Sequence, residues 1–439
     1  MSKIAFEDGG AQEETVSAFL MLVLEYGMEI GLLGIHGLLD RLLRVAMKTV
    51  RYSPLDKAQT IIASLVLGCA HTKAINETLG QEVAAANYLG RARFPDQSQI
   101  NRYLTRFTAP NVDELGGVHE QVLRQESRAR RAAGLLVVDI DQCGVVANGQ
   151  TYEFHRKGYF PRQRGVEGYQ VSLAYLGAYD EAIQLYLDPG NVHCKDRLAA
   201  LLRDVDRLLG PEETAVDLVC RLDAGYDSAQ NRVLLAARPG YVVLKGAQSA
   251  VARRLAQGVA LQEWRPVTDD VHGTEVAPDA SGLRRLVYEL HQTDGTVAYA
   301  LLYTNLPAAA WGLGRLFTFY NERTTIEAFF AAARHVYNVQ NLRSRKFHAI
   351  YAFLRFVILT HNLLHWAKQA RLAPTALVTA TTRQLVCSAA RVRAHLHWDG
   401  HWHIRILRSS PWAALLIEAL TAPPQPVQLA LPFARLHKT

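Results

Sequence analysis

Three acidic residues stand in or at the end of strongly apolar stretches of this 439-residue chain. Asp141 ends the run LLVVDID, Asp223 ends the run VDLVCRLD, and Glu327 lies in YNERTTIEAFF. An ionised carboxylate in such surroundings is costly unless it is paired or bound to a metal. Carboxylates that converge from separate elements hold two divalent cations about 3.5–4 Å apart in enzymes that cut phosphodiester bonds, and Mg²⁺ prefers such oxygen ligands. We therefore predict a magnesium site; for each acid taken singly, a helix cap, a turn acid or a salt bridge is the alternative.

Further acids flank the first two positions. Asp139 lies two residues before Asp141, and the pleat of a strand places both side chains on one face. We expect Asp141, which is nearer the strand end, to be the ligand and Asp139 to lie behind it. Asp217 and Asp227 flank Asp223, and Asp227 is predicted to open a helix as its N-cap or as an acid of its first turn.

The segment around Glu327 carries an aromatic residue and two cations at helical spacing. Tyr320, Arg323, Glu327 and Arg334 fall at positions i, i+3, i+7 and i+14, which predicts one stripe along a single helix. A stripe that aims Glu327 at metal ions would also aim the two arginines at nearby phosphates. The alternative is a solvated salt bridge between Arg323 and Glu327.

The segments that must position these acids alternate between strand and helix patterns from Gly134 onward. The run 135–141 is β-rich and apolar throughout, as in a strand that is buried on both faces of a sheet. The following elements are predicted in the order strand, strand, strand, helix, strand, helix, strand, at 152–154, 169–175, 183–187, 195–209, 216–222, 228–237 and 241–244. This order predicts an α/β layered sheet.

Two other patterns flank that core. Residues 1–132 are predicted to form an all-helical N-terminal domain. Within it, residues 58–107 would hold either a helix-turn-helix or a helical packing unit without DNA contact. Residues 247–315 alternate short β patterns with Gly, Asp and Thr turns, which predicts a mainly β insertion. The chain then becomes helical again up to about residue 370.

Basic residues cluster beside the acidic segments, and the chain carries a formal net charge of +7. One cluster spans 155–164, with Tyr159 and Phe160 interleaved, and others span 124–131 and 343–346. Neutralising several phosphates gives strong, salt-dependent affinity for nucleic acid. A solvated surface is the alternative for each cluster alone, but their position beside the acids favours DNA. The candidate DNA-binding residues in these clusters are Arg156, Lys157, Arg343, Arg345 and Lys346.

The sequence argues against a disulfide framework, a thiolate zinc site and a membrane span. Its five cysteines are widely spaced and form no CxxC pair, which is typical of reduced cytosolic thiols. Two apolar stretches, 17–39 and 351–366, contain charged or titratable residues that are costly in lipid, so we expect core helices. The start MSKIAFEDGG lacks signal-peptide features. We therefore expect a cytoplasmic protein without a membrane partner. The residues that exclude spans are Glu25, Glu29, Arg355, His361 and His365.

The acidic segments resemble the catalytic blocks of bacterial insertion-sequence DDE transposases with a Tyr-Arg-Glu-Lys signature. That signature separates its residues by two, three and six others, as Tyr320, Arg323, Glu327 and Arg334 are separated here. DIDQCGVVANGQTYEFHRKGYFP, DPGNVHCKDRLAALLRD, RLDAGYDS and YTNLP resemble other blocks of the group, in its order, over residues 135–366. Arg334 departs from the signature lysine, and Gln142-Cys143 replaces a small polar residue and Thr.

The resemblance implies a ribonuclease H-like fold in which Asp141, Asp223 and Glu327 bind two Mg²⁺ ions, which Mn²⁺ can replace. It also implies that Tyr320, Arg323 and Arg334 hold the DNA end. The interval between Asp223 and Glu327 is too long for a bare strand-to-helix connection, and the β insertion would fill it, as in relatives that cut through a hairpin intermediate. The domain boundaries expected are 1–132 for a helical N-terminal domain that could bind DNA ends, 133–246 with 316–370 for the catalytic core, 247–315 for the insertion and 371–439 for a C-terminal region that could contact DNA or a second subunit.

The predicted activity is cut-and-paste DNA transposition at terminal inverted repeats, by a homodimer that brings the element ends and target DNA together. Two alternatives stay open. One is a transposase that has lost catalysis and only binds DNA, which the departures at Arg334 and Gln142-Cys143 would allow. The other is a metal-dependent nuclease that cuts without joining. Trp264 and Trp311, in or beside the insertion, would either pack in the core or stack on a flipped base.

Overall fold

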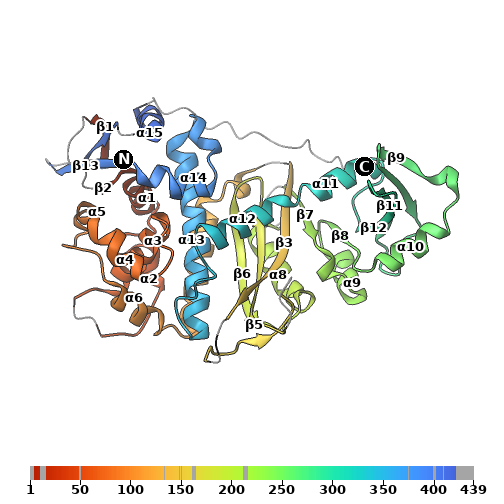
Figure 1. The fold of residues 1–439 in the computed structure, drawn as a ribbon, viewed down its shortest axis with the longest axis horizontal. Helices are drawn as coiled ribbons and strands as arrows, with labels where there is room; N and C mark the ends of the chain where they lie inside the picture. The colour runs from red at the N-terminus through yellow and green to blue at the C-terminus, as the bar shows by residue number, and fades with distance from the viewer. Residues whose placement is uncertain are drawn as a thin grey trace. The chain divides into compact units, whose positions relative to one another are not determined.

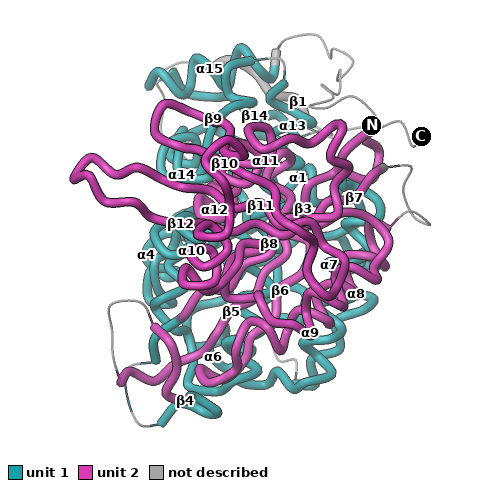
Figure 2. Tube along the Cα trace, turned by 90° about the vertical axis from the view of Figure 1, so that its right-hand side faces the viewer, with its two compact units in different colours: residues 1–127, 145–155, 330–429 teal, residues 128–144, 156–329, 430–439 magenta. Residues whose placement is uncertain are grey.

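The computed structural model describes residues 4–9, 16–48, 51–132, 134–147, 149, 151–160, 165–210, 216–373, 375–398, 402–408 and 410–421. The chain divides into two compact units (Figure 2). Unit 1 comprises residues 1–127, 145–155 and 330–429, and unit 2 comprises residues 128–144, 156–329 and 430–439.

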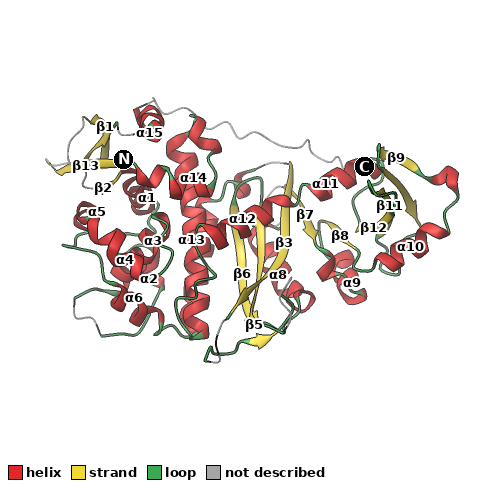
Figure 3. Ribbon diagram, in the orientation of Figure 1, coloured by secondary structure: helices red, strands yellow, loops and turns green. Residues whose placement is uncertain are grey.

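Unit 2 contains most of a ten-stranded mixed sheet (Figure 3). β3 (Gly134–Val146), β7 (Val216–Leu222) and β8 (Tyr241–Lys245) are parallel neighbours within it. The strand order is β4-β5-β3-β7-β8-β12-β11-β10-β9, with β6 paired to β5. The predicted α/β sheet is therefore confirmed. The other strands are β4 (Arg156–Lys157), β5 (Glu167–Leu176), β6 (Glu181–Pro189), β9 (Arg265–Thr268), β10 (Val271–Val276), β11 (Arg284–His291) and β12 (Val297–Thr304).

The strands within residues 247–315 continue this sheet instead of forming a separate one. β12 pairs antiparallel with β8, with Tyr303 opposite Leu244, and one apolar cluster includes Val219 of β7, Leu286 of β11 and Trp311. The indole of Trp311 is 1% exposed, and its ring packs edge-on against Phe319 with 4.8 Å between the centroids. Of the two alternatives for Trp311, core packing or stacking on a flipped base, the structure therefore supports core packing.

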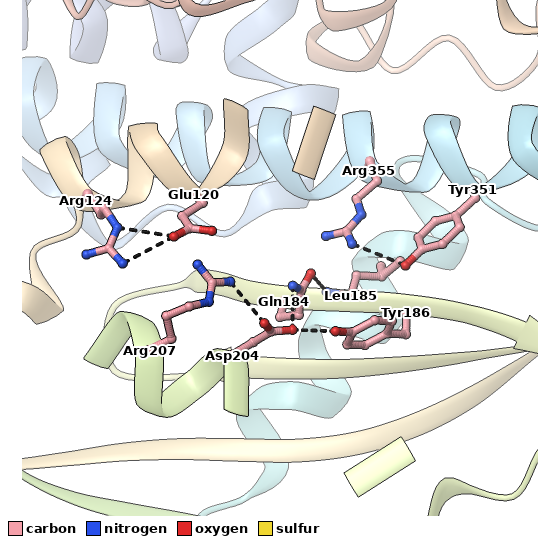
Figure 4. A network of polar contacts seen from close by, with 9 residues as sticks. All are labelled: Glu120, Arg124, Gln184, Leu185, Tyr186, Asp204, Arg207, Tyr351 and Arg355. Carbon is pink, nitrogen blue, oxygen red and sulfur yellow. Dashed lines mark hydrogen bonds and ion pairs between the residues drawn. The ribbon is translucent and has the colours of Figure 1, made fainter. Parts of the chain in front are cut away.

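The helices of unit 2 pack on the sheet or follow its strands. α8 begins where the side chain of His193 accepts a hydrogen bond from the amide of Lys195. Its Asp204 carboxylate accepts hydrogen bonds from Gln184 (2.8 Å) and Tyr186 (2.5 Å), which fixes α8 on β6 (Figure 4). The helices are α8 (Cys194–Leu209), α9 (Ala229–Ala237), α10 (Ser249–Gln257), α11 (Leu313–Asn321) and α12 (Thr324–His335), with short 3-10 turns at Ala129–Arg131, Ala224–Tyr226 and Leu261–Glu263; α12 ends in unit 1.

Unit 1 is mainly helical (Figure 1). Its long helix α13 (Phe347–Leu372) packs against α1 (Ala18–Glu29), α3 (Pro54–Val66) and α7 (Ala109–Glu126). α3 starts at a capping box made by Ser53 and Asp56, as the Ser-Pro sequence favours. The remaining helices are α2 (Leu38–Leu42), α4 (Lys73–Thr78), α5 (Val83–Tyr88), α6 (Gln97–Leu104), α14 (Thr382–Cys387) and α15 (Pro411–Thr421), with 3-10 turns at Leu79–Gln81, Ala376–Thr379 and Ala389–Arg391.

A small sheet joins the two ends of the chain within unit 1. β1 (Ile4–Gly9) pairs parallel with β14 (Trp402–Leu407), and β2 (Val16–Ser17) pairs antiparallel with β13 (Arg393–Trp398). The prediction of an all-helical N-terminal domain is therefore wrong for these segments, because β1 and β2 are strands. Local periodicity cannot reveal these strands, because their partners lie almost the whole chain away.

α13 is the one helix of the described residues that is long and apolar enough to cross a membrane, and 83% of its apolar window is buried inside the protein. Two of its buried polar side chains have partners there. Asn362 contacts the imidazole of His119 at 2.9 Å, and His365 contacts the hydroxyl of Thr382 at 2.9 Å. These contacts match the prediction of a core helix in this segment.

Candidate active site on β3 and after β7

Two of the three predicted carboxylates lie side by side because β3 and β7 are parallel neighbours in register. Asp139 is opposite Arg221 and Ile140 is opposite Leu222. Asp141 is the next residue of β3, which continues to Val146, and Asp223 directly follows the last residue of β7. The expectation that Asp141 lies near a strand end is therefore wrong, whereas Asp223 lies where ligands of open α/β sheets bind, outside the carboxyl end of a parallel strand.

Arg323 brings a positive charge between these two acids. It lies between the end of α11 and the start of α12, and its side chain is 10% exposed. The Nη1 atom lies 3.1 Å from Oδ2 of Asp141, and Nη2 lies 3.8 Å from Oδ1 of Asp223. Both terminal nitrogens therefore form ion pairs with the acids, and the single positive charge offsets part of their combined negative charge.

The pKa of Asp141 shows that all three predicted acids interact. Burial raises the pKa of Asp141 to about 6, and the charges of Asp223 and Glu327 raise it further, while Arg323 and the amide of Gln142 oppose the shift. The Asp141 side chain is 17% exposed and that of Asp223 is 43% exposed. Glu327 lies in the first turn of α12 and is exposed. Three elements thus deliver carboxylates to one electrostatically coupled site.

The predicted stripe from Tyr320 to Arg334 is broken into two helices. α11 ends at Asn321 and α12 begins at Thr324, so Tyr320 and Glu327 do not share a helix. Regular i+3 and i+4 spacing continues across this turn, which explains the error in the sequence prediction. Arg323 also pairs with acids of the sheet, so the alternative of a solvated Arg323–Glu327 bridge is wrong.

The other residues of the predicted DNA-end group lie on α11 and α12. Burial raises the pKa of Tyr320 to about 12, with a smaller opposing effect from the charge of Arg323, so Tyr320 is a largely enclosed neighbour of that arginine. Arg334 lies in the last turn of α12 and is exposed.

The basic clusters differ in how their side chains are used. In unit 2, Arg156 and Lys157 are exposed on β4. In unit 1, Arg345 and Lys346 are exposed. Arg343, also in unit 1, donates to the carbonyl oxygens of Cys69 (2.8 Å) and Ala70, and its guanidinium lies 4.8 Å from the centre of the Phe353 ring. Burial lowers the pKa of Arg343 to about 10, and its polar atoms already serve the fold.

The structure adds neighbours that the sequence analysis did not single out. Arg221 forms a buried pair with Asp139. Tyr226 is buried, and its hydroxyl has no hydrogen-bond partner among the described residues. Burial raises the pKa of Tyr226, and the charges of Cys194 and Asp141 raise it further. Arg221 could have been found by the rule that identified the acids, because it is the one cation inside the apolar run VDLVCRLD.

The oxygen ligands at this site suit a hard divalent cation. Among the described residues, no group of three or more His, Cys, Asp and Glu side chains already stands in a metal-binding arrangement. Arg323 instead supplies the positive charge that Asp141 and Asp223 require. A cation that binds between these carboxylates would therefore compete with this guanidinium.

The family model described as Transposase DDE domain group 1 matches residues 21–423. No curated protein matches the sequence. Among solved structures, a piggyBac transposase synaptic complex with hairpin DNA has 11% identity and a TM-score of 0.43, over 94% of this chain and 87% of that chain. A Mos1 mariner paired end complex with Mn has 13% identity and a TM-score of 0.17, over 45% of this chain and 60% of that chain.

The family match covers nearly the whole chain and includes all three carboxylates, which lie on β3, directly after β7 and at the start of α12. The chain therefore belongs to the transposase DDE domain group 1 family and is a DDE transposase, an enzyme of metal-dependent DNA cleavage and strand transfer.

Proposed function

We propose that Asp141, Asp223 and Glu327 are the metal ligands of this transposase and that they hold two Mg²⁺ ions, which Mn²⁺ can replace. The observation that carries this proposal is that Arg323, in the turn directly before the helix of Glu327, pairs with both Asp141 and Asp223. Bound divalent cations would activate the attacking water or 3′-hydroxyl and relieve charge on the phosphate. Asp141 lies on β3, Asp223 directly follows β7 and Glu327 lies in the first turn of α12, so all three carboxylates are attached to regular elements.

Arg323 has two roles in this proposal. Without DNA and metal it forms ion pairs with Asp141 and Asp223, and with both bound it turns its guanidinium to a phosphate oxygen at the cleavage site. A guanidinium suits this exchange because it stays charged and offers several donors in a fixed plane. Tyr320 and Arg334 would hold the DNA end with it, and Arg334 keeps the charge of the signature lysine.

We further propose cut-and-paste transposition through hairpin ends, in a homodimeric synaptic complex that holds terminal inverted repeats and target DNA. The support for the hairpin step is the strand-rich segment 247–315 between the second and third acids. The exposed Arg156, Lys157, Arg345 and Lys346 would contact phosphates. The protein would work in the bacterial cytoplasm, where its five free cysteines stay reduced.

The test uses purified full-length protein and DNA that carries the inverted repeats flanking its gene. With Mg²⁺ or Mn²⁺ it should nick the repeat ends and join them to a target plasmid, and Asp223→Asn should abolish both reactions. Asp269→Asn, an exposed aspartate in the turn before β10, is the matched control. Nicking without joining would favour a nuclease, and repeat-specific binding without cleavage would favour a transposase that has lost catalysis. Undiminished nicking by Asp223→Asn would remove Asp223 from the site.

A further inference from the structure

A buried ion pair lies directly behind the two aspartates of the proposed metal site. Asp139 on β3 and Arg221 on β7 are 0% and 5% exposed. The Nε atom of Arg221 donates to Oδ1 of Asp139 at 2.7 Å, and Nη2 donates to Oδ2 at 2.9 Å. The two residues are opposite each other in the parallel ladder, so the pair spans neighbouring strands with both oxygens used.

Strand geometry relates this pair to the site. Residues two apart on a strand face the same side of the sheet, so Asp139 and Arg221 lie on the face that also carries Asp141 and Asp223. The ion pair therefore lies on the same face of the sheet, two residues before Asp141 on one chain segment and two residues before Asp223 on the other.

The same pair also holds the turn between α11 and α12. Arg221 donates through Nη1 to the carbonyl oxygen of Phe319, and its guanidinium lies 4.9 Å from the centre of that ring. On the other side of the turn, the hydroxyl of Thr325 donates to Oδ2 of Asp139 at 3.1 Å. One contact precedes Arg323 in the sequence and the other follows it.

Thr325 is closely enclosed by the turn after β5. A Cβ atom added at Gly177 would lie 2.1 Å from the Thr325 hydroxyl oxygen, so any side chain at that position would displace the threonine. Gly177 thus leaves the space in which the Thr325 hydroxyl meets Asp139. This close approach fixes the start of α12, two residues before Glu327.

We infer that Asp139, Arg221 and Thr325 are positioning residues, which together hold α12 so that Glu327 meets Asp141 and Asp223. The inference rests on the proposed metal site. Stability alone explains the arrangement poorly, because replacing a buried ion pair by apolar residues of similar volume is often neutral or stabilising. The strands are already joined by their backbone ladder, whereas the turn of α11 and α12 gains its fixed place on the sheet from these side chains.

The first test removes only the hydroxyl of Thr325. Mn²⁺ binding to the DNA-free full-length protein is measured by the electron paramagnetic resonance signal of free Mn²⁺, and the melting temperature is measured without metal. Thr325→Val should lower Mn²⁺ affinity about tenfold, at the lower end of the 10- to 100-fold cost of losing such outer contacts, with little change in metal-free melting temperature. Thr325→Ser should retain the wild-type affinity.

The second test replaces the ion pair as a unit. The double variant Asp139→Leu/Arg221→Met should melt at or above the wild-type temperature without metal and still lose Mn²⁺ affinity. Wild-type affinity in both Thr325→Val and the double variant would overturn the positioning role. Asp223→Asn distinguishes failure of the positioning role from failure of the proposed metal site. If this variant binds Mn²⁺ as tightly as wild type does, the proposed metal site is wrong, and the inference is overturned with it.

Discussion

The guanidinium of Arg323 lies 3.1 Å from the Asp141 carboxylate and 3.8 Å from that of Asp223. A single cationic side chain from the turn between two helices thus pairs with one acid on β3 and one acid directly after β7. The arrangement offsets part of the negative charge of the metal-free site and makes metal binding a competition between two kinds of cation.

The first prediction concerns this competition. Arg323→Gln should bind Mn²⁺ about tenfold more tightly than wild type in the absence of DNA, a difference of about 1.4 kcal/mol, because the competing charge is gone. The metal-free variant should melt earlier, since removing one partner of a buried pair leaves the other uncompensated, and Mn²⁺ should restore it. Titration of Mn²⁺ and thermal melting check both effects. Arg334→Gln, which alters an exposed residue, is the control; equal affinities in wild type and Arg323→Gln would exclude the competition.

The second prediction concerns the pH dependence of stability. Burial raises the pKa of Asp141 to about 6, above the ordinary aspartate value of about 4, so the folded chain binds this proton more tightly than the unfolded chain does. Lowering the pH from 7 to 4 should therefore stabilise the metal-free fold through this group, by up to about 3 kcal/mol. That contribution is lost as the pH rises through 6.

Asp141→Asn isolates this effect, because asparagine does not titrate. The free energy of unfolding of the variant, taken relative to that of wild type, should be highest at pH 7 and should decrease as the pH falls to 4. Urea unfolding at a series of pH values measures the difference. Mn²⁺ affinity of the wild type should fall below pH 6, because the ligand must lose its proton. A stability difference that does not vary with pH would contradict the raised pKa.

The third prediction separates core packing from base stacking among the tryptophans. Trp311→Ala should lower the free energy of unfolding by about 3–5 kcal/mol, because its ring lies within the shared apolar cluster. Trp398, which is 54% exposed, should tolerate alanine with little change. Chemical denaturation of both variants makes the comparison. A fully stable Trp311→Ala that fails in cleavage would instead favour a role on DNA.

The fourth prediction divides the basic cluster at 343–346. Lys346→Ala should weaken DNA binding at every sequence tested and reduce the slope of log affinity against log salt by about 1, as loss of one phosphate contact does. Arg343→Ala should chiefly lower stability, because its donors hold the carbonyl oxygens of Cys69 and Ala70. Salt titrations of DNA binding and thermal melts distinguish the two effects. A large salt-slope change in Arg343→Ala with an unchanged melting temperature would reverse this division.

The sequence predicted the acids and their strands because both depend on local pattern. Asp141 and Asp223 are visible as charges at the ends of buried apolar runs, and β3 and β7 follow from the same runs. The break between α11 and α12 was missed because helical spacing continues through it, so the role of Arg323 as a partner of the sheet acids was also hidden. That role depends on a contact between residues about 180 positions apart, which no local pattern contains.

Strand partners were likewise beyond the reach of local patterns. The β character of 247–315 was evident, but the pairing of β12 with β8 depends on residues on both sides of α10. β1 and β2 have partners near the opposite end of the chain, so the sequence analysis took the N-terminal segment to be all-helical.

The ladder between β12 and β8 limits how this enzyme can be shortened. A chain that joined Lys245 directly to Arg315 would leave β8 with one bare edge, and Val243 would lose Leu286, Leu302 and Trp311 as neighbours in its cluster. Exposed edges invite pairing with other chains. The segment 247–315 therefore cannot be deleted without disrupting the core sheet. Transferring it to another transposase will succeed only where the recipient has a strand that pairs with β12 and an apolar surface that fits the cluster.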